Sequence, residues 1–206
     1  MRTRKVLTML TVFVTAVVVV EGQQRPLSPR GQSSTQVGGA YNAQGRYQGG
    51  HWIDIDYGRP ILRGRENIFG EGDEFGQRIY AGAPIWRIGA DPSTRFSTEV
   101  DLVFGGQRLP AGEYSIFADL KPGEWTLVFS NYGAKQTPRE DTPNTIWGAY
   151  GYTPDMDVLR TTMQVTTHPV SADQLIVTFT DMTQQGGNFT IWWDNQIATT
   201  AFTVAP

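Results

Sequence analysis

Apolar and polar residues alternate along much of the segment from Asp91 to Ser130. Even-numbered positions from 96 to 104 carry Phe, Thr, Val, Leu and Phe, whereas odd-numbered positions from 95 to 101 carry Arg, Ser, Glu and Asp. This period of two is typical of a strand with one buried face. Turn-forming sequences follow at 105–106, 110–112 and 121–124. The segment is therefore predicted to form a β-meander.

Strand patterns also occur on both sides of the meander, and none of them has a sustained helical period. They lie at residues 35–41, 51–57, 145–150, 157–167, 174–182, 188–194 and 196–204. Short strands separated by Gly, Pro, Asn and Asp are typical of sandwiches and barrels. We expect an all-β fold over residues 35–206: a single antiparallel, jelly-roll-like β-sandwich of about nine or ten strands.

Two of the connections between the predicted strands are unusually long. Residues 58–83 contain six glycines and form a long segment, in which a helical turn is expected near Glu74–Tyr80. Connections of this length are usually functional or partly folded. Residues 131–144 are polar and include two prolines, which predicts an exposed, mobile loop. This second loop is either a lid or a simple insertion.

The N-terminal residues 1–22 have the pattern of a signal peptide. Three basic residues lie within the first five positions, and residues 6–20 are uncharged and mostly apolar. A helix that spans a bilayer needs about 20 such residues, so an uncleaved membrane anchor is the less favoured alternative. Residues 23–34 lack apolar periodicity and are predicted to be a disordered leader. The expected location is the periplasm or the extracellular space.

Composition narrows the class of protein further. The chain contains no cysteine, which excludes disulfides, thiolate metal sites and thiol nucleophiles. An exported bacterial protein is favoured, because secreted eukaryotic domains more often carry disulfides. The formal charge is −3, and loss of residues 1–22 would remove three basic groups and one acidic group. An acidic chain argues against nucleic acid as a partner.

Several short strings, in order along the chain, are similar to a bacterial family of exported proteins known as domain of unknown function 2911. They are Tyr57–Pro60, Arg63–Arg65, Ile68–Gly70, Trp86–Ala90, Leu109–Phe117, Trp125–Phe129, Trp147–Tyr150 and Asp157–Arg160. The resemblance covers roughly residues 35–204 and implies an exported all-β domain without an assigned activity or established catalytic residues. Residues 91–94 and the longer loop before Trp147 depart from the family pattern.

Few residues offer catalytic chemistry. The only histidines are His51, which shares a strand face with isoleucines, and His168, which precedes a proline at a strand end. No hydrolase, zinc-protease, phosphate-loop or calcium-loop motif is found. The sequence therefore predicts no catalytic residue, no metal ligand set and no cofactor, and an enzyme is the less favoured class.

One predicted strand face combines an aromatic residue with two carboxylates. Trp52, Asp54 and Asp56 alternate with Ile53 and Ile55, so they point to the same side. The two carboxylates lie about 7 Å apart along a strand. This face is a candidate for ligand binding, with a catalytic carboxylate pair, a calcium site or a solvated, arginine-paired surface as the alternatives.

Arginines gather in and beside the glycine-rich connection, at positions 59, 63, 65, 78 and 87. A guanidinium group suits carboxylates and phosphates. The arginines either neutralise neighbouring acidic residues through paired hydrogen bonds or form a site for an anionic ligand. Arg59 and Arg87 are the preferred ligand-binding candidates, because each lies in one of the family-like strings.

Aromatic residues suggest a second route to ligand binding. Trp125 and Trp193 alternate with apolar neighbours and are predicted to be in the core. Trp192 faces the opposite way on the same strand, either in a second buried layer or as an exposed platform.

Together these features favour a non-enzymatic, exported binding or envelope-associated module whose ligand is a glycan or another polar or anionic molecule. One alternative is a carboxylate-dependent or calcium-assisted hydrolase that uses Asp54, Asp56 or Asp181. The other is a structural domain that holds an envelope protein partner through a sheet face or an edge strand.

Overall fold

The computed structural model describes residues 26–206, and the predicted signal peptide lies outside this range. Strands form most of the structure: β1 (Arg30–Val37), β2 (Ala40–Tyr41), β3 (Tyr47–Gln48), β4 (His51–Gly58), β5 (Thr94–Thr98), β6 (Leu102–Phe104), β7 (Gln107–Leu109), β8 (Gly112–Lys121), β9 (Glu124–Ser130), β10 (Gly133–Ala134), β11 (Thr145–Ile146), β12 (Asp157–Thr183) and β13 (Gly186–Val204). Short helical turns are η1 (Gly72–Glu74), α1 (Gln77–Tyr80) and η2 (Pro154–Met156). None of the helices in this range is long and apolar enough to cross a membrane.

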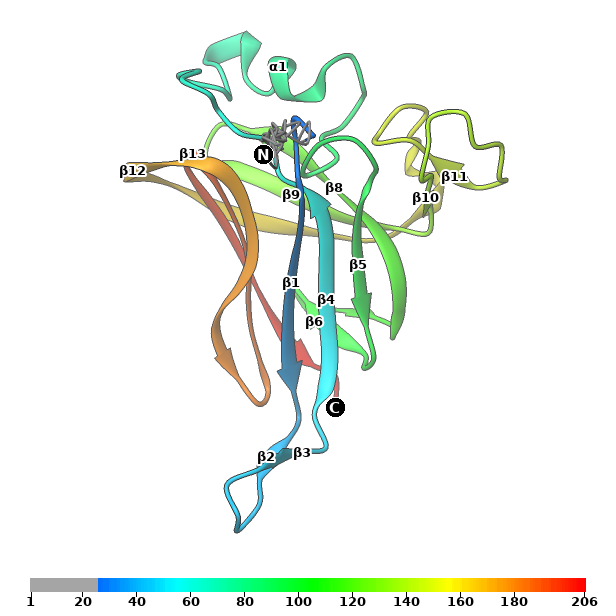
Figure 1. Cartoon of the computed structure of the whole chain (residues 1–206), viewed down its shortest axis with the longest axis vertical. Helices are drawn as coiled ribbons and strands as arrows, with labels where there is room; N and C mark the ends of the chain where they lie inside the picture. Colours follow the sequence, from blue (N-terminus) through cyan, green and yellow to red (C-terminus); the bar gives the residue numbers. More distant parts are fainter. Residues whose placement is uncertain (1–25) are drawn as a thin grey trace, which may run out of the picture.

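Nine strands form one open antiparallel sheet in the order β1-β4-β5-β8-β9-β12-β13-β6-β7. The sheet folds back on itself, so that the second half of β12 faces β1 and β4 (Figure 1). The hydroxyl of Ser33 in β1 donates to the carbonyl of Val177 in β12, and the amide of Val177 donates to the hydroxyl of Tyr57 in β4. The prediction of a single antiparallel β-sandwich with nine or ten strands is confirmed.

The strands β12 and β13 are long because each runs through both layers. Near its start β12 pairs with β9, with Leu159 opposite Phe129. Its pairing with β13 is irregular between Thr167 and Ile176, which is where the strand bends toward the other layer. The predicted separate strands 157–167 and 174–182 are thus one bent strand. The same holds for 188–194 and 196–204, which join through Asp194 with a left-handed backbone (φ 50°).

The alternation between Phe96 and Phe104 is divided between two strands that have different partners. β5 pairs with β4 and β8, whereas β6 pairs with β13 and β7. The corner between them is held by the carboxylate of Asp101, which accepts hydrogen bonds from the Ala111 amide and the Arg108 guanidinium, both at 2.7 Å. Both phenylalanines stay in the same core, because the two layers face each other there.

The first strand begins at Arg30, so the prediction of a disordered leader through residue 34 is wrong for residues 30–34. All eight residues of β1 pair with β4 in unbroken register. The apolar signal is missing because this edge strand presents Gln32 and Ser34 to solvent, and its inward Ser33 uses a hydrogen bond to Val177. The predicted strand 35–41 is also interrupted, since Gly38 and Gly39 separate β1 from β2.

The main core lies between the two layers and is closed at one end by the connection from β4 to β5. Phe69 and Trp86 from this connection pack against Trp125 of β9 and Trp193 of β13, with ring centroids 5.0 to 6.3 Å apart. All four side chains are buried. The core positions predicted for Trp125 and Trp193 are confirmed, while Trp192 is partly buried. The predicted helical turn within 74–80 is confirmed as α1.

A smaller apolar cluster lies on the outer face of the first layer, the part of the sheet formed by β1, β4, β5, β8, β9 and the start of β12. Phe117 of β8 and Val128 of β9 point away from the main core and pack against Ile146 and Ala149. These two residues belong to the segment 131–156 between β9 and β12, which we call the cover segment. Only Thr145–Ile146 of the predicted strand 145–150 is a strand, paired in parallel with β10. The later part of this connection therefore covers the sheet instead of forming one of its strands.

Candidate functional site

A row of polar residues crosses the outer face of the first layer. Direct register pairs link Asp56 of β4 to Arg95 of β5, Arg95 to Ser115 of β8, Ser115 to Ser130 of β9, and Ser130 to Asp157 of β12. We call these five residues the polar row. Neighbouring strands lie about 4.8 Å apart, so the row forms a continuous polar track across five strands.

The alternation of each strand places these side chains outside. Residues adjacent to members of the row point inward and are buried in the main core: Ile55, Tyr57, Phe96, Tyr114, Ile116 and Phe129. Because successive side chains point to opposite faces, the polar members must point outward. Neighbouring strands add one polar residue each at the same level, which makes the row.

The cover segment buries the middle of the row. Ser115 and Ser130 are fully buried, and both hydroxyl groups have hydrogen-bond partners. Arg95 donates from Nη1 to the Ser115 hydroxyl at 3.2 Å and to the Tyr132 carbonyl at 3.1 Å. Ser130 donates to the Met156 carbonyl at 3.1 Å. The cover segment is thus hydrogen-bonded directly to the row that it covers.

One end of the row opens into a hollow of about 320 Å³, which we call the charged hollow. Its walls come from β1, β4, β5, β8 and the cover segment: Arg30, Asp56, Arg95, Phe96, Ser97, Glu113 and Gln136. Arg30 forms an ion pair with Asp56, and Arg95 pairs with Glu113 at 3.1 Å. The Glu113 side chain is 76% exposed, and such a pair contributes at most about 1 kcal/mol to stability.

The two guanidinium groups of the charged hollow differ in their surroundings. Arg95 donates hydrogen bonds to the Ser115 hydroxyl and the Tyr132 carbonyl, so the sheet and the cover segment together fix its position. Burial lowers the pKa of Arg30, while the negative charge of Asp91 acts in the opposite direction. A partly dehydrated cation gains more from a further anionic partner than a fully hydrated one does.

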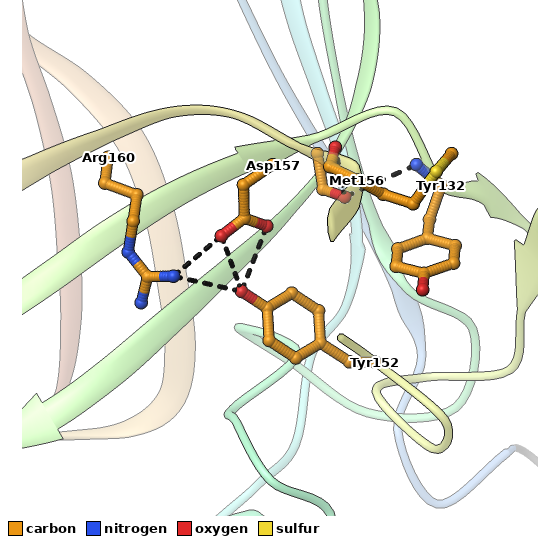
Figure 2. Close-up of polar contacts among 6 residues, drawn as sticks. Tyr132, Tyr152, Met156, Asp157 and Arg160 are labelled. Atoms are coloured by element: carbon orange, nitrogen blue, oxygen red, sulfur yellow. Dashed lines mark hydrogen bonds and ion pairs between the residues drawn. The ribbon is translucent and has the colours of Figure 1, made fainter. Parts of the chain in front are cut away.

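The other end of the row is a compact polar cluster, the Tyr152 clamp (Figure 2). The Tyr152 hydroxyl lies 3.0 and 2.8 Å from the two carboxylate oxygens of Asp157. Arg160 donates to the same carboxylate at 2.7 Å and to the Tyr152 hydroxyl at 3.3 Å. The three polar groups point toward one another, and they join the cover segment to β12.

Burial determines the protonation of the clamp. It raises the pKa of Tyr152, and the hydrogen bond to Asp157 raises it further. The pKa of Asp157 is also raised by burial, although Tyr152 and Arg160 oppose this effect. The Tyr152 ring packs on Phe117 with centroids 5.0 Å apart. At neutral pH the tyrosine is therefore a fixed hydrogen-bond donor, and the clamp fastens the cover segment.

Comparison with known proteins identifies the family. The sequence matches the family described as Protein of unknown function (DUF2911) over residues 40–202, which is most of the chain. The chain belongs to the DUF2911 family. No curated protein and no solved structure matches it. The resemblance seen in the short strings is thus confirmed, and Arg30 lies outside the matched range, ten residues before its start.

In this DUF2911 protein Trp52, Asp54 and Asp56 lie on the outer face of β4, but at different positions along the strand. Asp56 lines the charged hollow. Asp54 lies opposite Ser97 and accepts a hydrogen bond from the Ser34 hydroxyl. Trp52 is farther down the same face and is 46% exposed. A role of these three residues in ligand binding stays a prediction.

The two arginines predicted as ligand-binding residues are not among the residues that line the charged hollow, and they contact other parts of the chain. Arg59 donates to the Leu175 carbonyl at 3.4 Å and lies against Gly31, so it contacts β1 and β12. Arg87 donates to the Asp91 carbonyl at 3.1 Å and covers the ring of Tyr150 at 5.1 Å. These contacts connect segments of the DUF2911 fold to one another.

The carboxylates that the hydrolase alternative would need do not converge. Asp54 and Asp56 face outward from the first layer, whereas Asp181 belongs to β12 in the facing layer and accepts a hydrogen bond from the Asn188 amide at 2.9 Å. Within residues 26–206, no cluster of three or more His, Cys, Asp or Glu residues could hold a metal ion.

Sequence reasoning missed the residues that build the charged hollow around Asp56. Arg30 falls within the predicted leader, Arg95 is one of the polar positions of the predicted meander, and Glu113 lies in one of the family-like strings. The signal that unites them is the register between strands, which places Asp56 opposite Arg95 and Glu113 opposite Ser97.

Proposed function

We propose that this DUF2911 protein is an exported, non-enzymatic binding module that holds a small carboxylated ligand in the charged hollow. The observation that carries the proposal is the position of Arg95. Its Nη1 group is held by Ser115 and Tyr132, while its Nη2 group faces the exposed carboxylate of Glu113. A ligand carboxylate can replace Glu113, because a highly exposed side chain rotates away at little cost in free energy.

The remaining walls of the hollow suit a ligand with further polar groups. Arg30 and Asp56 supply one cation and one anion on the side of β1 and β4. Ser97 and Gln136 supply a hydroxyl and an amide, each of which can donate and accept hydrogen bonds. Hydroxy acids and acidic sugars combine a carboxylate with hydroxyl groups, so they are the ligand class that this lining favours.

The cover segment contributes to the proposed binding site. It fixes the back of Arg95 through the Tyr132 carbonyl and places Gln136 at the rim of the hollow. A site built from fixed hydrogen-bond donors before the ligand arrives loses less conformational entropy on binding. Export to the periplasm or the cell exterior is part of the proposal and is supported by the signal-peptide pattern at residues 1–22.

The test is a thermal-shift and calorimetry screen of the purified protein with lactate, citrate, glucuronate and galacturonate. A ligand at about 100 times its Kd stabilises the fold by about 2.7 kcal/mol, which raises Tm by several degrees. Arg95→Lys keeps the charge but removes the fork of donors, and it should weaken binding about tenfold. Glu113→Gln removes the competing carboxylate and should tighten binding.

Glu124→Gln is the matched control, because Glu124 is an exposed residue at the turn between β8 and β9, outside the hollow. It should leave the affinity unchanged. Absence of any response from the four acids would contradict the proposal. So would equal affinities of the wild type, Arg95→Lys and Glu113→Gln proteins.

A further inference from the structure

A hairpin formed by β2 and β3 projects from the end of the sandwich opposite α1 (Figure 1). Its loop is held by Asn42, whose side-chain oxygen accepts hydrogen bonds from the amides of Gln44 and Arg46 at 3.0 and 2.9 Å. A backbone hydrogen bond from Asn42 to the Arg46 carbonyl closes the same loop. The hairpin is therefore a defined platform for the side chains that it carries.

Two tyrosine rings meet on this hairpin. Tyr47 lies over Gly39 and Gly50, where an added Cβ atom would come within 2.3 and 2.6 Å of the ring. Its hydroxyl accepts a hydrogen bond from the Gly39 amide at 3.0 Å. The Tyr41 ring packs against Tyr47 at 5.3 Å with planes at 69°, and Tyr41 is 72% exposed. Tyr47 is thus fixed, and it supports a ring that solvent reaches.

The two rings form one side of a hollow of about 480 Å³, the hairpin hollow. The rest of its lining comes from β1, the end of β12 and the turn that follows β12: Gln36, Met182, Thr183 and Gln184. The Gly38 amide donates to the Gln184 carbonyl at 2.7 Å and joins the two sides. None of these six lining residues carries a charge, in contrast with the charged hollow.

This combination of groups suits a sugar. An aromatic ring has a negative face, on which the slightly positive C–H groups of a pyranose can stack. The amides of Gln36 and Gln184 and the hydroxyl of Thr183 both donate and accept hydrogen bonds, as sugar hydroxyl groups do. We propose that the hairpin hollow binds a neutral oligosaccharide with one sugar ring stacked on Tyr41. This site rests on observations independent of the charged hollow.

The test is a titration of the purified protein with three neutral trisaccharides: cellotriose, maltotriose and triacetylchitotriose. Met182 lines the hollow, so the signal of its labelled methyl group in an NMR spectrum reports binding at this place. At least one trisaccharide should shift that signal in a saturable manner. Tyr41→Ala should weaken binding about tenfold, as loss of a stacked ring does. Tyr41→Phe keeps the ring and should bind within about twofold of the wild type.

Tyr41 is exposed, so its substitution leaves the core intact, and a thermal melt verifies that the variants fold. Glu113→Gln in the charged hollow should leave trisaccharide binding unchanged, which separates the two sites. The proposal is overturned if none of the three sugars shifts the Met182 signal. It is also overturned if Tyr41→Ala binds as tightly as the wild type.

Discussion

The two long connections of the first layer are fastened to the sheet by different means. The connection 59–93 sends Phe69 and Trp86 into the main core, where they contact Trp125 and Trp193. The cover segment 131–156 has only a small apolar cluster beneath it and is secured by the polar contacts of the Tyr152 clamp. The connection 59–93 is thus part of the main core, whereas the cover segment lies on the outer face of the first layer.

The two connections should therefore differ in their main contribution, which is fold stability for the connection 59–93 and ligand binding for the cover segment. Burial of one large aromatic side chain contributes about 1.5–3 kcal/mol, so the connection 59–93 belongs with the groups that keep the protein folded. The cover segment supplies Gln136 to the charged hollow and the Tyr132 carbonyl to Arg95, and it contributes less apolar burial. Substitutions in the first connection should lower the free energy of unfolding, and substitutions in the second should act more on ligand affinity.

The largest expected effect is that of Phe69→Ala. Loss of a buried phenylalanine leaves a cavity among three tryptophans and should lower the free energy of unfolding by about 3–5 kcal/mol. Urea denaturation followed by tryptophan fluorescence measures the change. Gln77→Ala in the same connection is the control, because Gln77 is exposed. A loss below 1 kcal/mol for Phe69→Ala would contradict the assignment of this connection to the core.

Tyr152→Phe should have an intermediate effect. It removes the hydroxyl that donates to Asp157, and the loss of such a hydrogen bond costs about 1–2 kcal/mol. It should also release the cover segment, which hydrogen exchange at residues 144–153 would detect. The matched control is Tyr132→Phe, which removes a hydroxyl bonded to the exposed Thr153 at 3.0 Å. Equal exchange rates in both variants would argue against the clamp.

Alkaline pH should weaken the attachment of the first connection to β8. Burial raises the pKa of Tyr80 to about 12, whereas an unfolded tyrosine ionises near pH 10. The stability that Tyr80 contributes is therefore complete below pH 10 and is lost as the pH rises toward 12. Urea midpoints at pH 9 and pH 11.5 should differ less in Tyr80→Phe than in the wild type. Identical differences would show that Tyr80 is not responsible.

The smallest effect is expected for Arg87→Ala, which tests the link between the two connections. Arg87 belongs to the first connection and covers the ring of Tyr150 in the cover segment. An exposed contact of this kind contributes about 0.5–1 kcal/mol. Urea denaturation should show a loss of that size, and calorimetry should show unchanged affinity for carboxylates. A large loss of affinity would instead make Arg87 part of the binding site.

The strands could be predicted because alternation is a local property of the chain. Residues 51–57 were predicted to form a strand, and β4 occupies 51–58. The polar row could not be predicted, because Ser115 and Ser130 are 15 residues apart and meet only through the register of β8 and β9. Arg30 was missed because β1 is an edge strand with polar residues on its outer side.

The core role of the connection 59–93 was hidden for a related reason. Phe69 follows Ile68 and Trp86 follows Ile85, but these short apolar pairs are not repeated at a strand or helix period, so no periodic pattern marks them as buried. Their burial follows from the open end of the sandwich, which exists only once both layers have formed. By contrast, Trp125 and Trp193 lie in regular strands, and their alternation was sufficient to predict burial.

The continuity of β12 and β13 through both layers has a consequence for the order of folding. β12 pairs with β9 in one layer and with β13 over most of its length, and β13 ends on β6, about 100 residues earlier in the sequence. Neither layer is complete until β13 has been synthesised, and contacts of such long sequence separation form slowly. A nascent chain therefore has no closed sandwich until β13 emerges, which is compatible with the export that we propose.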